Sequence, residues 1–312
     1  MTAQRAAAID IGSNSIKVLV AEAAADGALK VLLSHTIEAR ISAGISRTNP
    51  VLSEQGMQRG LEAIVELLAL CAGHHPGRIQ IVATSAVRDA ANGADFSQRV
   101  KTATGHSIRI LSGREEAHYI GQGIAHDPGL DNIQDFYLFD LGGGSLETLS
   151  FRQRQVCRIH SLQLGCVRLT ERFLPDRGAP QPPELATSVI QHTAATIREA
   201  GFVFDLPKTA TVIGTGGTLA SVRSVLAARA GLRPEDGSAL LSAPALRSLH
   251  AELARMSLAE RRQVAGLSPA RADVFPVALA TLIGVAECGG FDSYRHSFCN
   301  LRHGLVAEML AV

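Results

Sequence analysis

Two short segments of the chain carry the same pattern of Asp, Gly and Ser residues. Residues 8–15 read AIDIGSNS and residues 138–145 read LFDLGGGS, so that Asp10 corresponds to Asp140 at an offset of 130 residues (140 − 10 = 130). In each copy an apolar strand runs into a tight turn, where backbone N–H groups and a short hydroxyl can bind a phosphate. The two aspartates are candidate ligands of a divalent cation such as Mg²⁺.

The repeat predicts a duplicated domain whose two turns face one phosphorylated ligand. The alternative is two ordinary hairpins, in which Gly serves the geometry and Asp serves the turn. That alternative requires the same order and chemistry to arise twice, so we favour the duplication. The candidate phosphate-binding residues are those of the two turns: Gly12, Ser13, Asn14, Ser15, Gly142, Gly143, Gly144 and Ser145.

Length and composition are typical of a two-domain globular protein. The chain has 312 residues, of which 46% are apolar and 19% are charged, and domains of about 150 residues are usual. Its longest apolar stretches fall short of the roughly 18 residues that span a bilayer, and its first residues lack a signal-peptide pattern. We therefore expect a cytoplasmic protein that does not bind membranes.

Charge and cysteine content argue against two further classes of protein, general nucleic-acid binders and proteins stabilised by zinc or disulfides. The net charge of +1 argues against a general nucleic-acid-binding surface, which would have a strong basic excess. The five cysteines are widely spaced and form no C-x-x-C pair, which predicts reduced thiols and argues against structural zinc or a disulfide framework.

The elements that must position the two turns follow from hydrophobic periodicity. We expect α/β architecture, with a domain over residues 1–125 and a second over 126–312, and a hinge in the polar segment 121–135. A terminal helix over 301–311 is a candidate to pack back on the first domain. Expected helices include 53–71, 94–104, 184–200, 219–228, 244–256 and 276–288, and expected strands include 6–10, 16–21, 78–83, 107–111, 135–140, 146–151, 157–164, 209–214 and 293–299, with a loop over 84–88.

Seven segments together resemble one known family. They are AIDIGSNSIKVLV (8–20), ATSAVRDAANG (83–93), LSGREEAHYIGQGI (111–124), FDLGGGSLE (139–147), LQLGCVRLTERF (162–173), GTGGTLASV (214–222) and ARADVFPVALATL (270–282). Their order and spacing resemble the exopolyphosphatase / guanosine pentaphosphate phosphohydrolase (Ppx/GppA) family, in its short form without a C-terminal domain of the HD type. The resemblance extends from near residue 7 to the C-terminus.

The resemblance implies two ribonuclease-H-like domains of the acetate and sugar kinase, chaperone ATPase and actin fold group, with an interdomain cleft. It implies Mg²⁺-dependent hydrolysis of a terminal phosphoanhydride, with Glu116 at the position of the catalytic base. Asp140 and Glu147 match the acidic residues associated with the metal and the attacking water. Asp10 matches the Asp of the first turn, a third candidate metal ligand, and Arg88 matches a phosphate-binding Arg.

Each candidate acid also has a structural interpretation. Glu115 and Glu116 are adjacent at the start of a helix, where acids stabilise the macrodipole. Adjacent helical residues point about 100° apart, so one Glu can act in chemistry while the other stabilises the helix terminus. Glu147 alternates with Leu146 and Thr148 along a strand, which also fits a residue that faces solvent.

The segment Gly214, Thr215, Gly216 and Gly217 is open to two interpretations. It resembles the loop that contacts adenosine in kinases of this fold group, and it would then line the far end of the cleft. It also fits a strand-to-helix turn with Thr218 as the N-cap. The first interpretation keeps an ATP-dependent kinase or ATPase as a competing function.

The chain departs from the family at its end. Many members have Leu-Arg-Glu-Gly where this chain has Leu-Arg-His-Gly over 301–304, so His303 leaves the role of that acid open. Without an HD-type domain the polyphosphate channel would be shorter or more open.

The sequence therefore predicts a phosphoanhydride hydrolase, an exopolyphosphatase acting on inorganic polyphosphate with Mg²⁺ or another divalent cation. Guanosine pentaphosphate is a second candidate substrate. The competing functions are the kinase or ATPase and a non-catalytic sensor of polyphosphate or an alarmone. The Pro-rich loop 175–183 and the last helix are candidate contacts of a homodimer.

Overall fold

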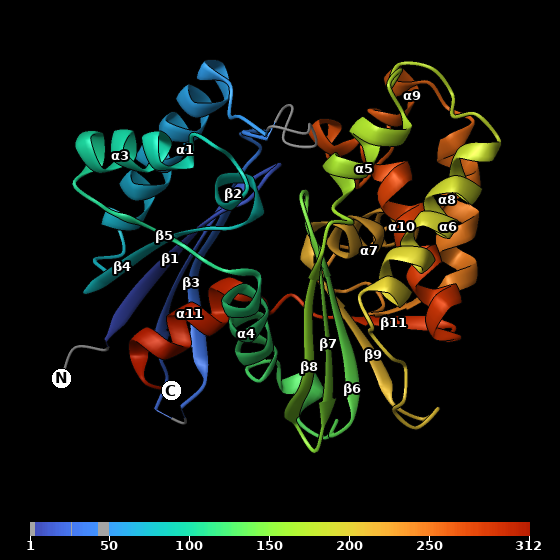
Figure 1. The fold of residues 1–312 in the computed structure, drawn as a ribbon. Coiled ribbons are helices and arrows are strands. Elements are labelled where there is room, and N and C mark those ends of the chain that lie inside the picture. Colours follow the sequence, from blue (N-terminus) through green and yellow to red (C-terminus); the bar gives the residue numbers. More distant parts are fainter. Residues whose placement is uncertain (1–3, 26, 43–49) are drawn as a thin grey trace. The chain divides into compact units, whose positions relative to one another are not determined.

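The computed structural model describes residues 4–25, 27–42 and 50–312. The chain divides into two compact units, each with its own sheet (Figure 1). Unit 1 consists of residues 1–132 together with 299–312, and unit 2 consists of residues 133–298. The division falls a few residues beyond the expected boundary at 125/126, and the terminal helix belongs to unit 1, because its apolar side chains are buried there.

Unit 1 has a five-stranded sheet in the order β3-β2-β1-β4-β5 among the described residues. The first three strands form an antiparallel meander, and β4 and β5 continue parallel to β1. The strands are β1 (Arg5–Ile11), β2 (Ile16–Ala23), β3 (Leu29–Ile37), β4 (Arg78–Ala83) and β5 (Ile108–Ile110).

Helices cover both faces of this sheet. Ile9 and Ile11 of β1 pack in one core with side chains of α1 and α3. Because side chains alternate along a strand, Ala8 and Asp10 belong to the other face, and α11 packs on β1, on β2 and on α4. The helices are α1 (Glu54–Ala72), α2 (Ser85–Arg88), α3 (Gly93–Thr104), α4 (Gly113–Ile124) and α11 (Leu301–Leu310), with a 3₁₀ turn at Pro128–Leu130.

Unit 2 repeats the topology of unit 1 and adds one strand. Its sheet has the order β10-β11-β9-β6-β7-β8, so that β8-β7-β6-β9-β11 corresponds to β3-β2-β1-β4-β5. The added strand β10 pairs antiparallel with β11 at the edge. The strands are β6 (Phe136–Leu141), β7 (Leu146–Arg152), β8 (Gln155–Leu162), β9 (Thr211–Thr215), β10 (Leu240–Ser242) and β11 (Ser293–His296).

The core of unit 2 is built around one apolar helix. In α10 (Phe275–Gly289) all positions from Phe275 to Ala286 are buried, and the helix contacts α5, α6, α7 and α8. The other helices are α5 (Cys166–Phe173), α6 (Glu184–Glu199), α7 (Gly216–Arg229), α8 (Ala243–Ala254) and α9 (Leu258–Arg261), with a 3₁₀ turn at Pro269–Arg271.

The structure confirms the duplicated α/β fold and most of the expected elements. Ser53 caps α1 through its hydroxyl, and Gly105 ends α3 in the left-handed region (φ 76°). The segment 84–88 was expected to be a loop; it contains the short helix α2, which begins directly after β4. The last expected strand is shorter than 293–299 and ends at His296.

Two expectations from the sequence concern the cysteines and membrane-spanning helices. All five cysteines are unpaired. Within the part of the chain that the structure describes, no helix is both long and apolar enough to cross a membrane.

Candidate functional site

The two Gly turns have the same backbone geometry. In unit 1 the N–H of Gly12 donates to the carbonyl of Ser15 (3.1 Å), and in unit 2 the N–H of Gly142 donates to the carbonyl of Ser145 (3.0 Å). Each turn joins two antiparallel strands of its sheet. The equivalence predicted from the sequence therefore extends from residue types to hydrogen bonds.

The strands beside the two turns carry opposite charges at one equivalent position. Asp10 lies directly opposite Lys17 in the β1–β2 register, whereas Asp140 lies directly opposite Glu147 in the β6–β7 register. Directly opposite residues on an antiparallel pair have Cβ atoms about 5 Å apart on the same face. Unit 1 thus pairs its turn aspartate with a cation, and unit 2 pairs its turn aspartate with a second carboxylate.

Asp10 is partly buried, and one of its carboxylate oxygens is shielded from solvent. Its Oδ1 atom is buried and has no hydrogen-bond partner among the described residues. Burial raises the pKa of Asp10, and the positive charges of Lys17 and Arg302 oppose that rise. Arg302 is fixed nearby because its Nη1 donates to the carbonyl of Val18 on β2 (2.8 Å).

The side chains of the first turn are bound to other segments of unit 1. Ser13 Oγ lies 3.3 Å from Ser85 Oγ at the start of α2. Asn14 donates through Nδ2 to Glu38 and accepts through Oδ1 from Arg40 Nε (3.3 Å). These contacts hold the turn in one conformation.

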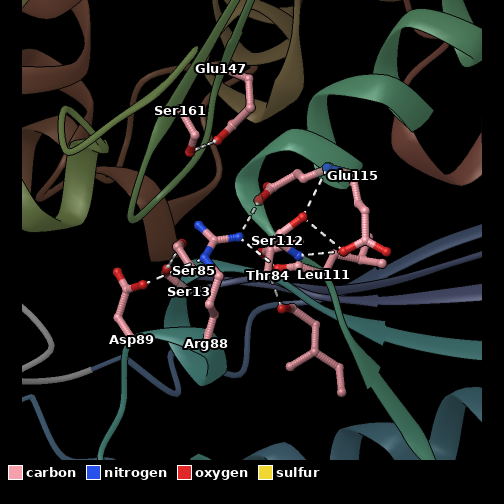
Figure 2. A network of polar contacts seen from close by, with 12 residues as sticks. Ser13, Thr84, Ser85, Arg88, Asp89, Leu111, Ser112, Glu115, Glu147 and Ser161 are labelled. Carbon is pink, nitrogen blue, oxygen red and sulfur yellow. Dashed lines mark hydrogen bonds and ion pairs between the residues drawn. The ribbon is translucent and has the colours of Figure 1, made fainter. Parts of the chain in front are cut away.

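Arg88 and Glu116 form an ion pair within unit 1. Figure 2 labels Arg88 together with the nearby Asp89 and Leu111. Arg88 Nη1 donates to Glu116 Oε2 (2.9 Å) and to the carbonyl of Leu111 (3.0 Å), while Arg88 Nε lies 3.5 Å from Asp89. Glu116 is only 7% exposed. The structure therefore joins two predicted site residues that lie 28 positions apart in the sequence.

Glu115 and Glu116 have different environments. Glu115 completes a capping box with Ser112, and it forms an ion pair with Arg109 (2.7 Å). Hydrogen bonds from Arg109 and Ser112 lower the pKa of Glu115 to about 2. The stabilising role expected for one of the two acids thus belongs to Glu115, and the buried Glu116 carboxylate faces Arg88.

In unit 2, Glu147 is buried and oriented by a neighbouring strand. Ser161 on β8 donates from Oγ to Glu147 Oε1 (2.8 Å), as Figure 2 shows, and Glu147 is 1% exposed. The interpretation of Glu147 as a residue that faces solvent is therefore wrong. Alternation along β7 was the only basis for it, and the alternate face of β7 is also covered.

The second turn is held by the first turn of α5. The N–H of Cys166 donates to the carbonyl of Gly142, and the N–H groups of Val167 and Arg168 donate to the carbonyl of Gly143. A Cβ at Gly165 would lie closer than 3.0 Å to the backbone of Gly143 and of the following residue. The unpaired N–H groups of a helix start here bind the carbonyls of the glycine turn.

The segment 214–217 forms a strand-to-helix turn. β9 ends at Thr215, which is the N-cap of α7, so Thr218 lies inside the helix and is not its cap. Gly216 has φ 88°, and a Cβ there would overlap the carboxylate of Asp140; a Cβ at Gly217 would lie 2.6 Å from Arg271 Nη1. The glycines therefore let Asp140 and Arg271 approach the backbone.

Arg271 and Lys17 are candidate site residues that the sequence analysis missed. Arg271 is 8% exposed, and its Nε has no hydrogen-bond partner among the described residues. Arg271 lies in the family-like segment 270–282, and Lys17 is the counterpart of Glu147 at the repeat offset of 130 (147 − 17 = 130). Aligning the two repeats beyond their turns would have identified Lys17.

The carboxylates of unit 2 suit Mg²⁺ better than an ion that needs many protein ligands. In the described part of the chain, no group of three or more His, Cys, Asp or Glu side chains has the arrangement of a metal site. Mg²⁺ is usually held by one or two carboxylates, with waters and phosphate oxygens as its other ligands. Asp140 opposite Glu147 provides such a pair within unit 2, so these residues fit the ion.

His303, which departs from the family pattern, acts in a helix cap. Asn300 caps α11, and the backbone N–H of Asn300 donates to His303 Nδ1 (3.2 Å), as in a capping box closed by Glu. Burial, with the nearby charges of Arg302 and His126, lowers the pKa of His303 to about 3. The neutral imidazole therefore accepts the hydrogen bond that closes the capping box, as a Glu carboxylate would, but it carries no charge.

The predicted residues fall in both units. Asp10, Arg88 and Glu116 belong to unit 1, and Asp140 and Glu147 belong to unit 2. The interdomain cleft that would join them stays a prediction. A cavity of about 780 Å³ within unit 2 is lined by Tyr137, Phe204 and Phe291 and does not include the predicted site residues.

Comparison with known proteins identifies related sequences and folds. Residues 19–312 match the model of the Ppx/GppA phosphatase family. The fold is similar to that of an exopolyphosphatase from Cytophaga hutchinsonii (TM-score 0.88, 22% identity, 99% of this chain and 98% of that one). It is also similar to a PPX-GPPA enzyme from Aquifex aeolicus (TM-score 0.78, 23% identity, 98% and 99%) and to an exopolyphosphatase-like protein (TM-score 0.88, 26% identity, 99% and 98%).

Proposed function

The chain belongs to the Ppx/GppA phosphatase family, and on this basis we propose that it is an exopolyphosphatase that hydrolyses the terminal phosphoanhydride of inorganic polyphosphate. Guanosine pentaphosphate, which also ends in a phosphoanhydride, is the second candidate substrate. The observation that carries the proposal is the buried Glu116 carboxylate, bound to Arg88 at 2.9 Å in the motifs typical of the family.

The proposed reaction requires a base, a positive charge and phosphate-binding dipoles. Glu116 orients a water molecule and accepts its proton as the water oxygen attacks the terminal phosphorus. The bond from that phosphorus to the bridging oxygen breaks, which releases orthophosphate and a polyphosphate shortened by one phosphate. Arg88 fixes Glu116 and offers positive charge to the phosphoryl oxygens, and the N–H groups of the two Gly turns offer further dipoles.

A divalent cation would complete this charge balance. Mg²⁺, when bound, neutralises charge on phosphate oxygens. We propose Asp140 and Glu147 as its protein ligands, with Asp10 as a third candidate. The positive charges of Lys17 and Arg302 already offset the negative charge of Asp10. The Asp140–Glu147 pair therefore has the greater need of a cation.

The test is phosphate release from polyphosphate by the wild type, Glu116→Gln and Glu115→Gln. We expect Glu116→Gln to lower kcat by roughly 10²–10⁴-fold, the usual contribution of a general base. Glu115→Gln removes an equal charge from the adjacent residue and should keep most of the activity, while losing about 1 kcal/mol of stability with its capping box.

Two outcomes would contradict the proposal. Near-wild-type turnover by Glu116→Gln would show that Glu116 is not the base. If short polyphosphate, long polyphosphate and guanosine pentaphosphate all released no phosphate with Mg²⁺ or Mn²⁺, the protein would not be such a hydrolase. ATP belongs in the same panel, because turnover of ATP alone would support the kinase or ATPase.

A further inference from the structure

The last helix of the chain is an internal part of unit 1. In α11, seven consecutive residues from Leu301 to Ala307 are buried, and α4, β1 and β2 surround the helix. Figure 1 shows α11 in red beside α4, among strands that come from the start of the chain. Most of the apolar surface of this helix is therefore covered within unit 1, and the homodimer stays a prediction.

Two glycines bring α11 and α4 into backbone contact. A Cβ at Gly304 would lie closer than 3.0 Å to the carbonyl oxygen of Tyr119 on α4. In the reciprocal contact, a Cβ at Gly123 on α4 would lie equally close to the carbonyl oxygen of Asn300, the cap of α11. Distances under 3.0 Å are essentially absent for real Cβ atoms, so any side chain at either position would push the helices apart.

Polar contacts fix α11 at two further points. Arg302 Nη1 donates to the carbonyl of Val18 (2.8 Å), and Arg78 Nη1 donates to the carbonyl of Met309 (3.1 Å). Burial raises the pKa of the Tyr119 hydroxyl, and the nearby Glu308 carboxylate raises it further. The two hydrogen bonds lie at both ends of α11 and reach two different elements, so they hold the helix in one position and orientation.

Glu116 lies one turn before Tyr119 on α4, and the position of that helix sets the distance from Glu116 to Arg88. We propose that Gly304 and Gly123 are positioning residues, whose missing side chains allow α11 to hold α4 where the Glu116 carboxylate meets Arg88. The inference rests on the proposed function of Glu116 as the base. It adds that the C-terminal helix sets the geometry of that base.

The experiment measures kcat and KM for polyphosphate in Gly304→Ala and Gly123→Ala. Accommodating a methyl group requires the helices to separate by roughly 1 Å, and a misplacement of that size can cost on the order of 10²-fold in rate. We expect kcat to fall by about that factor, with KM changed less than threefold. Gly73→Ala is the matched control, because its Cβ would meet its nearest neighbour at an ordinary 3.7 Å and it should retain wild-type kcat.

A double variant separates positioning from a general loss of structure. In the Glu116→Gln background, Gly304→Ala should cause no further loss of residual activity, because the base that it would misplace is already removed. A similar loss in both backgrounds, or wild-type kcat in both glycine variants, would overturn the inference.

Hydrogen exchange of residues 113–124 tests the same contact without catalysis. Faster exchange of α4 in Gly304→Ala, with the exchange of unit 2 unchanged, would support the inference, and unchanged exchange of α4 would overturn it. A wild type that releases no phosphate would refute the proposed function, while the exchange would still decide whether α11 positions α4. If Gly304→Ala does not fold, Gly123→Ala provides the same measurement from the opposite helix.

Discussion

Positions 17 and 147 are equivalent in the two repeats and carry opposite charges. In unit 1, Lys17 supplies a resident positive charge opposite Asp10. In unit 2, Glu147 faces Asp140, and like charges directly opposite each other on a sheet are destabilising. This difference in charge favours Asp140 and Glu147 over Asp10 as the proposed ligands of a cation.

This asymmetry predicts how stability responds to Mg²⁺. Saturating Mg²⁺ should raise the melting temperature of the wild type, because a ligand at 100 times its Kd stabilises by about 2.7 kcal/mol. Asp140→Asn should abolish that shift, because it removes one of the two proposed carboxylate ligands. Thermal unfolding with and without Mg²⁺ measures both effects. An equal Mg²⁺ shift in the variant would exclude Asp140 as a ligand.

His303 predicts a pH dependence of folding. The folded protein keeps this imidazole neutral down to about pH 3, whereas in the unfolded chain it takes up a proton near pH 6.5. Below pH 6.5 the unfolded state therefore binds more protons, and the free energy of unfolding falls as the pH drops from 6.5 toward 3. Between pH 6.5 and 5 we expect His303 to account for a loss of about 1–2 kcal/mol.

Denaturant unfolding of the wild type and His303→Gln at pH 7 and pH 5 measures this contribution. Glutamine keeps a hydrogen-bond acceptor for the cap but does not titrate. The wild type should lose more stability than the variant over this range. Parallel losses would show that burial does not lower the pKa of His303, so that it takes up its proton over the same pH range in the folded and unfolded states.

Much of the candidate site was predicted from the internal repeat and from motifs that resemble the family. The two turns, Glu116 and Arg88 were identified by motif, and the different roles of Glu115 and Glu116 follow from their spacing on a helix. Arg271 was missed because its proximity to Gly217 depends on how the 3₁₀ turn at Pro269–Arg271 packs on α7. Such approaches between distant segments leave no local pattern in the sequence.

Among the helices and strands, the predictable ones were long or strongly patterned. The helix over 53–71 has a cap and a clear apolar period, and it was placed to within one residue. β3 was missed because it is an edge strand with mixed exposure, so its side chains do not alternate cleanly. β10, α2 and α9 are only three or four residues long, too short to establish a period.

The contact between α5 and the second Gly turn yields a prediction for Gly165. Its missing side chain lets the start of α5 lie against the backbone of Gly143. Gly165→Ala should therefore destabilise unit 2 by about 2–3 kcal/mol and reduce phosphate release, because the turn must move. Gly178→Ala is the control, since its Cβ would meet only the flexible side chain of Asp176, at 3.3 Å. Equal unfolding free energies for the two variants would contradict the close packing.

The two units share one topology, which sequence analysis recovered from a repeat of eight residues. The strand order β3-β2-β1-β4-β5 recurs as β8-β7-β6-β9-β11. The return of the C-terminal residues to unit 1 was foreseen only as an alternative, because an apolar helix does not reveal which surface it will cover.

Removing residues 299–312 should therefore affect the two units differently. Unit 1 loses the helix that covers α4, β1 and β2, whereas unit 2 keeps all its own strands and helices. In the truncated protein we expect fast amide exchange in β1, β2 and α4 and near-native protection in α10. Equal protection of both units would show that α11 is dispensable for unit 1.

The return of the chain to unit 1 has a consequence for the timing of synthesis. Residues 133–298 must be translated between the two parts of unit 1 (298 − 132 = 166 residues), which takes roughly 10–30 s at about 5–20 residues per second. During that interval, the apolar surface of α4, β1 and β2 that α11 later covers is exposed and accessible to chaperones. A chain whose synthesis stops within this interval would lack α11. Its α4 helix, and with it the proposed base Glu116, would then not be held in position.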